Sequence, residues 1–305
     1  LAHFDWYDGG VISALADAFV QSLDRSNSQD CSNVLLALAK LKWYEKDIVS
    51  KLAGAAVECV SSSKPQEMAN NLWSLSSLGW YECAVYDELV AGLVKSPEQP
   101  KPQEFSNAIY SCAMASHSGA AVDALADVVN KQDLSGWDDH HVANSLYAWS
   151  VLCLLGMASP ELNAMASALF SDANRRGPAS ISISQDLNQL CTAHMEAERV
   201  GLHGGGLGTA NGLLQAAAKD FGQYLTGLRE EKRKEGGVLK RAVAALQQAG
   251  YEVELGAGVG QDGLAVDLHV RHESFPSGLA VDVLSEGAFF RHPRGQLNGK
   301  VAAVH

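Results

Sequence analysis

Asparagine recurs at a fixed interval of 37 residues through the first half of this chain. Four asparagines keep the interval: Asn33, Asn70, Asn107 and Asn144. Tryptophan keeps the same interval at Trp6, Trp43 and Trp80, and each of these tryptophans is followed by Tyr and an acidic residue. Two columns that agree on one period indicate an internal repeat, which limits the fold to stacked copies of one unit.

Apolar residues occupy fixed places around each asparagine. Two residues before it lie Cys31, Met68, Phe105 and Val142, and five residues after it lie Leu38, Leu75, Cys112 and Trp149. A fifth unit around Asn188 follows after 44 residues instead of 37, which we attribute to a Pro-, Gly- and Ser-rich insertion at 173–182. Residues 1–203 are therefore expected to form one array.

Each unit is predicted to contain two helices. Residues 65–78 carry apolar side chains at helical spacing, begin with a proline suited to a first turn and stop at Gly79. Residues 86–94 carry a second apolar stripe before the Ser96-Pro97 break. One such hairpin cannot bury its apolar side alone, whereas stacked hairpins can. We therefore predict a mainly α fold, an α-solenoid of helical hairpins with a concave surface.

The period is lost after residue 203. A flexible connector is predicted where glycines gather: Gly204, Gly205, Gly206, Gly208 and Gly212. Helices are predicted over 213–228 and 238–249, with the charged run 229–235 as a solvated helix face. Short β-like runs follow at 251–255, 264–270 and 279–284. Three parts are thus expected: the array at 1–203, a connector and charged helix at 204–237, and a small α/β module at 238–305.

The chain has a net charge of -12, from 23 basic and 35 acidic residues. Because phosphates are bound by Lys and Arg, this charge alone argues against nucleic acid. The excess lies entirely in residues 1–203, which hold 12 basic and 24 acidic residues. A solenoid has a convex and a concave face, so this excess can lie on the face turned away from a ligand. Few phosphate contacts then remain, which favours recognition of base edges or dependence on partner proteins.

The repeat unit resembles a known family. Residues 65–79, Pro-Gln-Glu-Met-Ala-Asn-Asn-Leu-Trp-Ser-Leu-Ser-Ser-Leu-Gly, resemble the octotricopeptide repeat (OPR), which is typical of organellar RNA-binding proteins in algae. Residues 102–110 repeat its opening and 141–149 its middle, while 29–44 and 184–195 match mainly by register. The resemblance implies a mitochondrial or chloroplast protein that binds single-stranded or ribosomal RNA. Its role would be RNA maturation or stability, or stabilisation of rRNA as a subunit of an organellar ribosome.

The C-terminal part resembles the start of a RAP domain, which commonly ends organellar RNA-binding repeat proteins. The order of four segments carries the resemblance: Gln248-Ala249-Gly250-Tyr251, Asp262-Gly263-Leu264-Ala265-Val266-Asp267, Leu279-Ala280-Val281-Asp282-Val283 and Gln296-Leu297-Asn298-Gly299-Lys300. It covers residues 238–305 and lacks the family's final strand and helix, so we expect an incomplete, degenerate module. The two resemblances support each other because such halves usually occur together.

The RAP fold is similar to small nucleases that hold a metal between carboxylates on adjacent strands. The residues that would serve are Asp267, Asp282, Glu286 and Lys300. Phosphodiester cleavage needs carboxylates that converge on the metal, with a Lys near the second one. This chain departs from the pattern, because Leu284 replaces the usual acidic residue, 285–288 replace a Gly-Pro-Ser-His stretch, and no Lys adjoins Asp282. We therefore expect no enzyme activity and keep a RAP-domain RNA endonuclease as an alternative.

No other motif indicates a cofactor, a metal or a membrane span. Residues 258–263 match a dinucleotide fingerprint by spelling, but no helix is predicted after them, so we interpret them as a turn. His140 and His141 are adjacent and do not share a helix face, so joint metal binding is not expected. The six cysteines show no paired short spacing, and three occupy apolar columns. Reduced core thiols in a non-secretory, reducing compartment are therefore expected.

Asparagine both donates and accepts hydrogen bonds, and helical-repeat proteins read bases with a few polar side chains per repeat. The predicted RNA contacts are the asparagine column and polar residues on the same stripe: Asn33, Lys40, Asn70, Ser74, Ser77, Asn107, Ser111, Asn144 and Asn188. A structural ladder, in which the asparagines cap or join the loops between units, is an equal alternative. The Trp-Tyr pairs at 43–44 and 80–81 either stack on bases or join hairpins, and we favour the structural role.

Three functions stay open at this point. RNA binding is the first choice, because of the repeat and the two resemblances. The second is an acidic protein-interaction scaffold in an organellar ribonucleoprotein, supported by the net charge of -12. The third is the RAP-domain endonuclease. A protein partner that co-purifies after RNase treatment would indicate the second, and Mg²⁺-dependent cleavage lost in Asp267→Ala would indicate the third.

Overall fold

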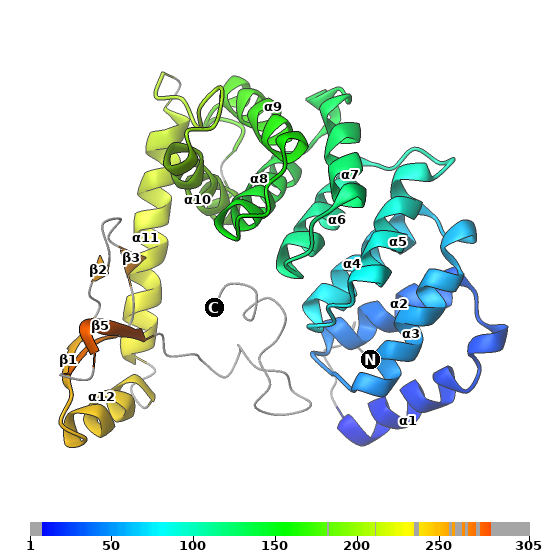
Figure 1. The fold of residues 1–305 in the computed structure, drawn as a ribbon, viewed down its shortest axis with the longest axis horizontal. Helices are drawn as coiled ribbons and strands as arrows, with labels where there is room; N and C mark the ends of the chain where they lie inside the picture. Colours follow the sequence, from blue (N-terminus) through cyan, green and yellow to red (C-terminus); the bar gives the residue numbers. More distant parts are fainter. Residues whose placement is uncertain are drawn as a thin grey trace. The chain divides into compact units, whose positions relative to one another are not determined.

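The computed structural model describes residues 8–181, 183–210, 212–234, 238–255, 258–259, 264–265, 268–272 and 275–281. Within these ranges the chain is mainly helical, and strands occur only after residue 251 (Figure 1). The predicted mainly α class is therefore confirmed. The described residues divide into two compact units, 8–218 and 219–281.

Ten helices of the first unit form two layers. The even-numbered layer holds α2 (Ser28–Lys40), α4 (Pro65–Ser77), α6 (Pro102–Met114), α8 (Asp139–Leu154) and α10 (Ser184–Val200). The odd-numbered layer holds α1 (Gly9–Val20), α3 (Lys46–Glu58), α5 (Cys83–Lys95), α7 (Ala120–Asn130) and α9 (Pro160–Arg176). Each helix packs on the next helix of its own layer. In Figure 1, α6 and α8 lie on the inner side of the curve that this unit follows, and α7 and α9 on its outer side.

Four even-numbered helices begin with the same capping interaction. The backbone N–H of the N-cap residue donates to the side chain three residues on: Asn27 to Asp30 (3.1 Å), Lys64 to Glu67 (3.0 Å), Lys101 to Glu104 (2.6 Å) and Asp138 to His141 (3.3 Å). This bond gives a partner to a donor at the helix start that the helix itself leaves free. The cap recurs every 37 residues, so the period also determines where each helix begins.

The five even-numbered helices end in one type of turn. One residue in each turn has left-handed backbone: Lys42, Gly79, Ser116, Gly156 and Gly201. The following N–H donates to the carbonyl five residues earlier, at 2.8–3.0 Å, which is the Schellman pattern. Gly79 ends its helix as predicted. For Lys42 and Ser116 this conformation costs about 1–2 kcal/mol, so the packing of the hairpin, and not glycine alone, imposes the turn.

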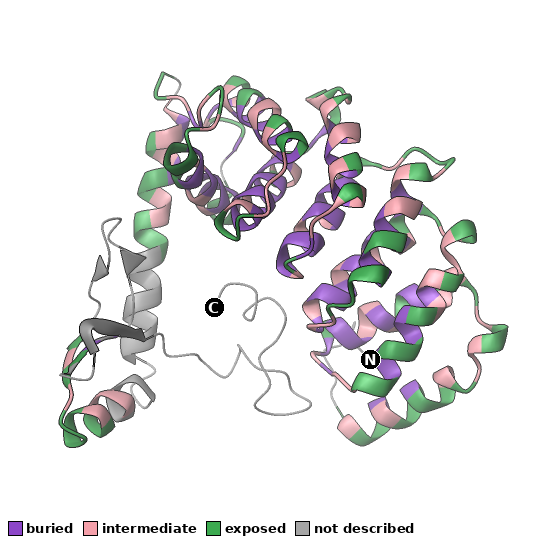
Figure 2. Cartoon of the chain, viewed as in Figure 1, coloured by how far each residue is buried: buried purple, intermediate pink, exposed green. Residues whose placement is uncertain are grey.

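The apolar columns predicted around the asparagines are buried. Their members are at most 3% exposed: Cys31, Met68, Phe105, Val142, Leu38, Leu75, Cys112 and Trp149. Figure 2 shows that buried residues lie along the sides of the helices that face their neighbours. Trp149 of α8 meets Phe170 of α9 edge-on, with ring centroids 6.0 Å apart, so an aromatic pair fills the space between the layers.

The cysteines, all six of which are described, are free thiols. The prediction that Cys31, Cys112 and Cys191 lie in the core is confirmed, since they are 1%, 0% and 5% exposed. Burial raises the pKa of the Cys31 thiol to about 11, with Cys59 and Asp30 adding to the effect. Burial also raises the pKa of Cys112 and Cys191. These thiols therefore stay protonated near neutral pH, the form that is unreactive.

The insertion predicted at 173–182 begins as helix. Helix α9 continues to Arg176, so residues 173–176 of this stretch are helical. With 16 and 17 residues, α8 and α9 are longer than the 13-residue α4 and α5. The longer interval before the fifth unit thus comes mainly from longer helices.

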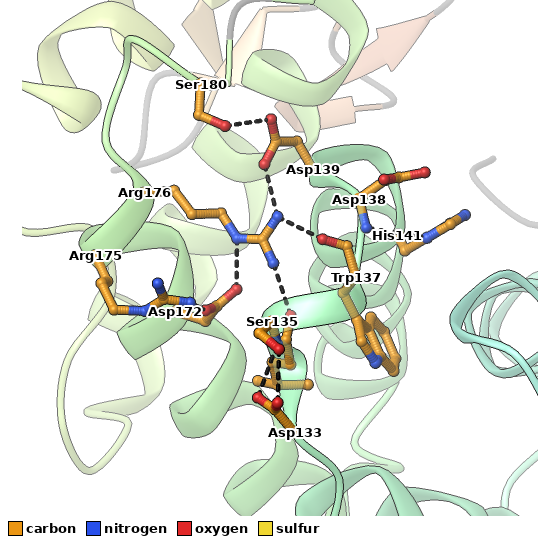
Figure 3. Close-up of polar contacts among 11 residues, drawn as sticks. Asp133, Ser135, Trp137, Asp138, Asp139, His141, Asp172, Arg175, Arg176 and Ser180 are labelled. Carbon is orange, nitrogen blue, oxygen red and sulfur yellow. Dashed lines mark hydrogen bonds and ion pairs between the residues drawn. The ribbon is translucent and has the colours of Figure 1, made fainter.

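Arg176, at the end of α9, bonds to the first residue of α8 and to the segment that precedes it. Its Nε donates to Asp172 Oδ2 at 2.6 Å and its Nη1 to Asp139 Oδ1 at 2.8 Å (Figure 3). The guanidinium also donates to the carbonyls of Trp137 and Leu134, at 2.6 and 3.0 Å. Burial acts to lower the pKa of Arg176, but the hydrogen bonds and charges of Asp139 and Asp172 outweigh it, so the pKa is raised.

The Gly-rich stretch after α10 is held in place, so the prediction of a flexible connector was wrong there. Asn174 Nδ2 donates to the Gly206 carbonyl at 3.1 Å, and the Gly208 N–H donates to Asn174 Oδ1 at 2.7 Å. The Leu207 N–H donates to His194 Nδ1 at 3.1 Å. A Cβ added to Gly206 would lie 2.3 Å from that nitrogen. Glycine here permits close approach to α10, which is its other common use.

The second unit contains most of α11 (Leu213–Lys234), α12 (Val238–Gln248) and a small sheet. The charged run predicted at 229–235 belongs to α11 as far as Lys234. Strands β1 (Glu252–Leu255), β4 (Leu268–His272) and β5 (Phe275–Val281) pair antiparallel in the order β1-β4-β5. Strands β2 (Gly258–Val259) and β3 (Leu264–Ala265) pair separately, so the predicted turn at 258–263 begins as strand. Helix α12 packs its apolar side on the buried Leu268 and Val270.

Gly206→Ala is expected to destabilise the fold by about 1–3 kcal/mol, because the added methyl group overlaps His194 and forces the segment away from α10. Gly54→Ala is the matched control, since a Cβ at this exposed position in α3 has nothing within 4 Å. It should stabilise by roughly 0.5–1 kcal/mol. Urea unfolding followed by circular dichroism measures both. A Gly206→Ala chain as stable as wild type would refute the packed role of this stretch.

Arg176→Met is expected to cost about 3–5 kcal/mol, because Oδ2 of the buried Asp172, Oδ1 of Asp139 and two carbonyls lose the donor that Arg176 supplies. The side chains of Arg176 and Asp172 are only 12% and 5% exposed. Arg175→Met is the control, because Arg175 also pairs with Asp172 but is 66% exposed, and should cost less than about 1 kcal/mol. Equal losses of unfolding free energy in the two variants would show that Arg176 has no special role.

Candidate nucleic-acid interface

A stripe of polar and aromatic side chains crosses three even-numbered helices. Its members are Gln66, Asn70 and Trp73 of α4, Gln103, Asn107 and Tyr110 of α6, and His140 and Tyr147 of α8, all partly or fully exposed. Within a helix they stand three, four or seven residues apart, so they share one face. We name this set the amide–aromatic stripe. Because α4, α6 and α8 pack in sequence, the three parts of the stripe lie on neighbouring helices.

The five asparagines occur on the five even-numbered helices, but their exposure differs. Asn33 is exposed, Asn70, Asn107 and Asn188 are partly exposed, and Asn144 is 7% exposed. Among the described residues, the side chains of Asn33, Asn70 and Asn107 have no hydrogen-bond partner. These three amides therefore have donors and acceptors available to a ligand. The Oδ1 of Asn188 is buried, which leaves less of that amide accessible.

Asn144 has a structural role. Its Nδ2 donates to Ser106 Oγ of α6 at 3.4 Å, and its Oδ1 accepts from Gln189 Nε2 of α10 at 3.2 Å. Ser106 Oγ in turn donates to the His141 carbonyl at 3.2 Å. One buried amide thus joins three successive helices. For this member of the column, a structural cross-link replaces the predicted base contact.

Two of the predicted serines are also structural. Ser74 Oγ donates to the Asn70 carbonyl at 2.7 Å, and Ser111 Oγ donates to the Asn107 carbonyl at 2.6 Å. Both serines are 0% exposed. Their hydroxyls hold the backbone behind the two asparagines and are not presented to a ligand.

The remaining predicted contacts lie toward the C-terminal ends of α2 and α4. Lys40 is exposed and Ser77 is partly exposed, so both can reach a ligand that follows the stripe. Trp43 is 1% exposed, which supports the structural role favoured for the Trp-Tyr pairs. Tyr81, by contrast, is 43% exposed.

An aromatic column was missed in the sequence although it keeps the same 37-residue interval. Trp73, Tyr110 and Tyr147 stand three residues after successive asparagines. The rings of Tyr110 and Tyr147 stack across α6 and α8, with centroids 6.3 Å apart and planes at 28°. Burial raises the pKa of Tyr110, and Tyr147 adds to the effect. The phenol therefore stays neutral at physiological pH.

The amide–aromatic stripe contains no Asp, Glu, Lys or Arg. Acidic groups of the even-numbered layer have partners: Asp30, Glu67 and Glu104 cap helices, Asp139 pairs with Arg176, and Glu196 pairs with Arg199. The buried Asp186 lies 2.7 Å from Nδ1 of His140, so one carboxylate adjoins the stripe at this member. Both layers carry acidic residues.

The residues considered for catalysis, Asp267, Asp282, Glu286 and Lys300, lie outside the described residues. Within the described ranges, no three His, Cys, Asp or Glu side chains gather in a way that suits a metal ion. No helix in those ranges has the length and apolar character needed to cross a bilayer.

No protein-family model matches the chain, and no curated protein matches it. The functional conclusion therefore rests on the chemistry and placement of the amide–aromatic stripe.

Asn144→Ala is expected to destabilise the fold by about 1–3 kcal/mol, because Ser106 and Gln189 lose a buried partner. Asn107→Ala, at the equivalent position of α6, should change the unfolding free energy by less than about 0.5 kcal/mol, since its side chain bonds to no other described residue. Urea unfolding compares the two. If Asn107→Ala costs as much as Asn144→Ala, the whole column is a structural ladder and its amides are not available to a ligand.

Proposed function

We propose that this protein binds single-stranded RNA along the amide–aromatic stripe. The observation that carries the proposal is a pairing repeated on two stacked helices. Asn70 lies one helical turn from Trp73 in α4, and Asn107 lies one turn from Tyr110 in α6. Exposed bases of RNA are read through hydrogen bonds to their edges and through stacking on aromatic side chains. Each of the two repeats offers a group of the first kind beside one of the second.

The free amides suit a base edge because one Asn side chain supplies both a donor and an acceptor. Their backbone positions are fixed by the Ser74 and Ser111 hydroxyls, which bond to the carbonyls of Asn70 and Asn107. A side chain presented from such a rigid support loses little conformational freedom on binding. The amides therefore favour specificity over general attraction.

The charge distribution favours RNA bound through its bases. No member of the stripe is Asp, Glu, Lys or Arg, and few lysines adjoin it: the exposed Lys64 and Lys101 stand two residues before Gln66 and Gln103, and Lys40 lies at the end of α2. Because each neutralised phosphate steepens the salt dependence of binding, few contacts mean a shallow dependence. A chain with a net charge of -12 can thus bind RNA, with weak attraction at long range.

The broader role that we propose follows the resemblances. The two-layer packing of helical hairpins supports an α-solenoid of the octotricopeptide type, and α12 with its antiparallel sheet supports an α/β module of the RAP type at 238–305. Proteins that combine such parts act on organellar RNA. We therefore place this protein in RNA maturation or stability, or in the stabilisation of rRNA within an organellar ribosome.

A protein-interaction scaffold is the second candidate. It is favoured by the absence of Lys and Arg from the stripe, because amides and aromatic rings also bind the backbone and side chains of extended peptides. A protein that stays bound to the purified chain after RNase treatment, and is lost in the Asn70→Ala, Asn107→Ala double variant, would support this candidate over RNA.

The double variant Asn70→Ala, Asn107→Ala is expected to lower affinity for RNA about tenfold or more, because each amide that pairs with a base contributes about 1 kcal/mol or more. Fluorescence anisotropy with labelled single-stranded fragments of total organellar RNA, at low salt, measures the loss. Gln99→Ala, in an exposed connection after α5, is the control and should bind as wild type does. Absence of binding to organellar RNA at low salt would overturn the proposed function.

A further inference from the structure

We infer that Trp73, Tyr110 and Tyr147 are the surfaces on which unpaired bases of the bound strand stack, one ring from each of three successive repeats. This assignment rests on the proposed RNA-binding function and adds to it Tyr147 as a third stacking residue, one base for each ring, and the exclusion of a duplex. Bases would be held by their faces on the rings and read at their edges by Asn70 and Asn107.

The placement of the rings is the first step. The three rings recur at the asparagine interval, on helices that pack in order as α4, α6 and α8. Each ring is partly exposed, so one part is anchored between helices and another part faces outward. An aromatic side chain anchored in this way is a rigid platform, because its rotamer is set by its neighbours.

Spacing decides which form of RNA fits. Neighbouring packed helices lie about 8–10 Å apart, whereas stacked bases of a nucleic-acid strand follow each other at about 3.4 Å. Tyr110 and Tyr147 stack on each other with ring centroids 6.3 Å apart, which is less than the roughly 6.8 Å, or two stacking steps, that a base between two rings needs. Bases can therefore lie only on the outer faces of this pair. Bases seated on rings of successive repeats therefore cannot stay stacked on one another. The fitting ligand is an unpaired, extended strand, and a duplex is excluded.

Rings and amides contribute differently to the binding of a strand. Stacking tolerates every base because each has a π face, so rings add affinity with little sequence preference. Amides distinguish base edges. Asn144 is committed to Ser106 and Gln189, so the repeat of α8 offers Tyr147 without a free amide. We expect it to accept any base, whereas the repeats of α4 and α6 discriminate.

The aromatic column does not extend to α2 or α10, where the equivalent positions hold Leu36 and the buried Cys191. At α2, Asn33 is exposed beside a partly exposed Leu36 in place of a ring. Leu36→Tyr would extend the column by one platform. Because this variant places a ring where a partly exposed leucine stands, it tests the inference by a gain of binding.

The test measures the affinity of the full chain for a labelled single-stranded RNA and for the same sequence as a duplex. Each of Trp73→Ala, Tyr110→Ala and Tyr147→Ala should weaken single-strand binding about tenfold, within the range found for one stacked base. The ring-keeping variants Trp73→Phe, Tyr110→Phe and Tyr147→Phe should stay within about twofold of wild type, and Leu36→Tyr should tighten binding. Circular dichroism confirms that each variant folds.

Salt dependence separates stacking from charge. The Ala variants should leave the slope of log affinity against log salt unchanged, whereas Lys40→Ala should make it shallower by about 1 if Lys40 contacts a phosphate.

If wild type binds single-stranded RNA but the folded Ala variants bind equally well, or if the duplex binds as tightly as the single strand, the assignment of the rings is overturned and RNA binding stands. If wild type binds no RNA, the proposed function fails and the inference fails with it. Should any Ala variant not fold, an unchanged affinity of Leu36→Tyr overturns the assignment.

Discussion

Burial of apolar columns between successive even-numbered helices is the interaction on which the rest of the first unit depends. Leu35, Leu72 and Ile109, each fully buried on its own helix, belong to faces that no single hairpin can cover. Recurring caps and Schellman turns give the helices matched starts and stops. Stacking therefore repeats one geometry, and whatever side chain stands on the uncovered face is repeated with it.

The uncovered face is where the repeats diverge in chemistry. Asn70 and Asn107 keep their amides available, while Asn144 uses its amide to join α6, α8 and α10. The change coincides with the longer α8 and α9 and with the Arg176 cluster. One residue type at one position thus has an unpartnered amide in the middle of the array and joins three helices toward its end.

Much of the array was predictable because the helix signals, the apolar columns and the caps all share one interval. The failures come from contacts that no local pattern records. Gly206 suits a flexible loop by type, yet Asn174 and His194, distant in sequence, hold its neighbourhood in place. Ser74 lies one helical turn after Asn70, but its side chain is buried and donates to the Asn70 carbonyl. The ring column was present in the sequence at the asparagine interval, and only its exposure identified it as a surface.

The central claim is that the even-numbered layer is the RNA-binding face. Photocrosslinking of single-stranded RNA that carries 4-thiouridine, followed by mass spectrometry of the modified peptides, tests it most directly. We expect crosslinks on peptides from α4, α6 and α8, at or beside Trp73, Tyr110 and Tyr147. Crosslinks confined to peptides of α3, α5, α7 and α9 would contradict the claim, as would a chain that is not crosslinked at all.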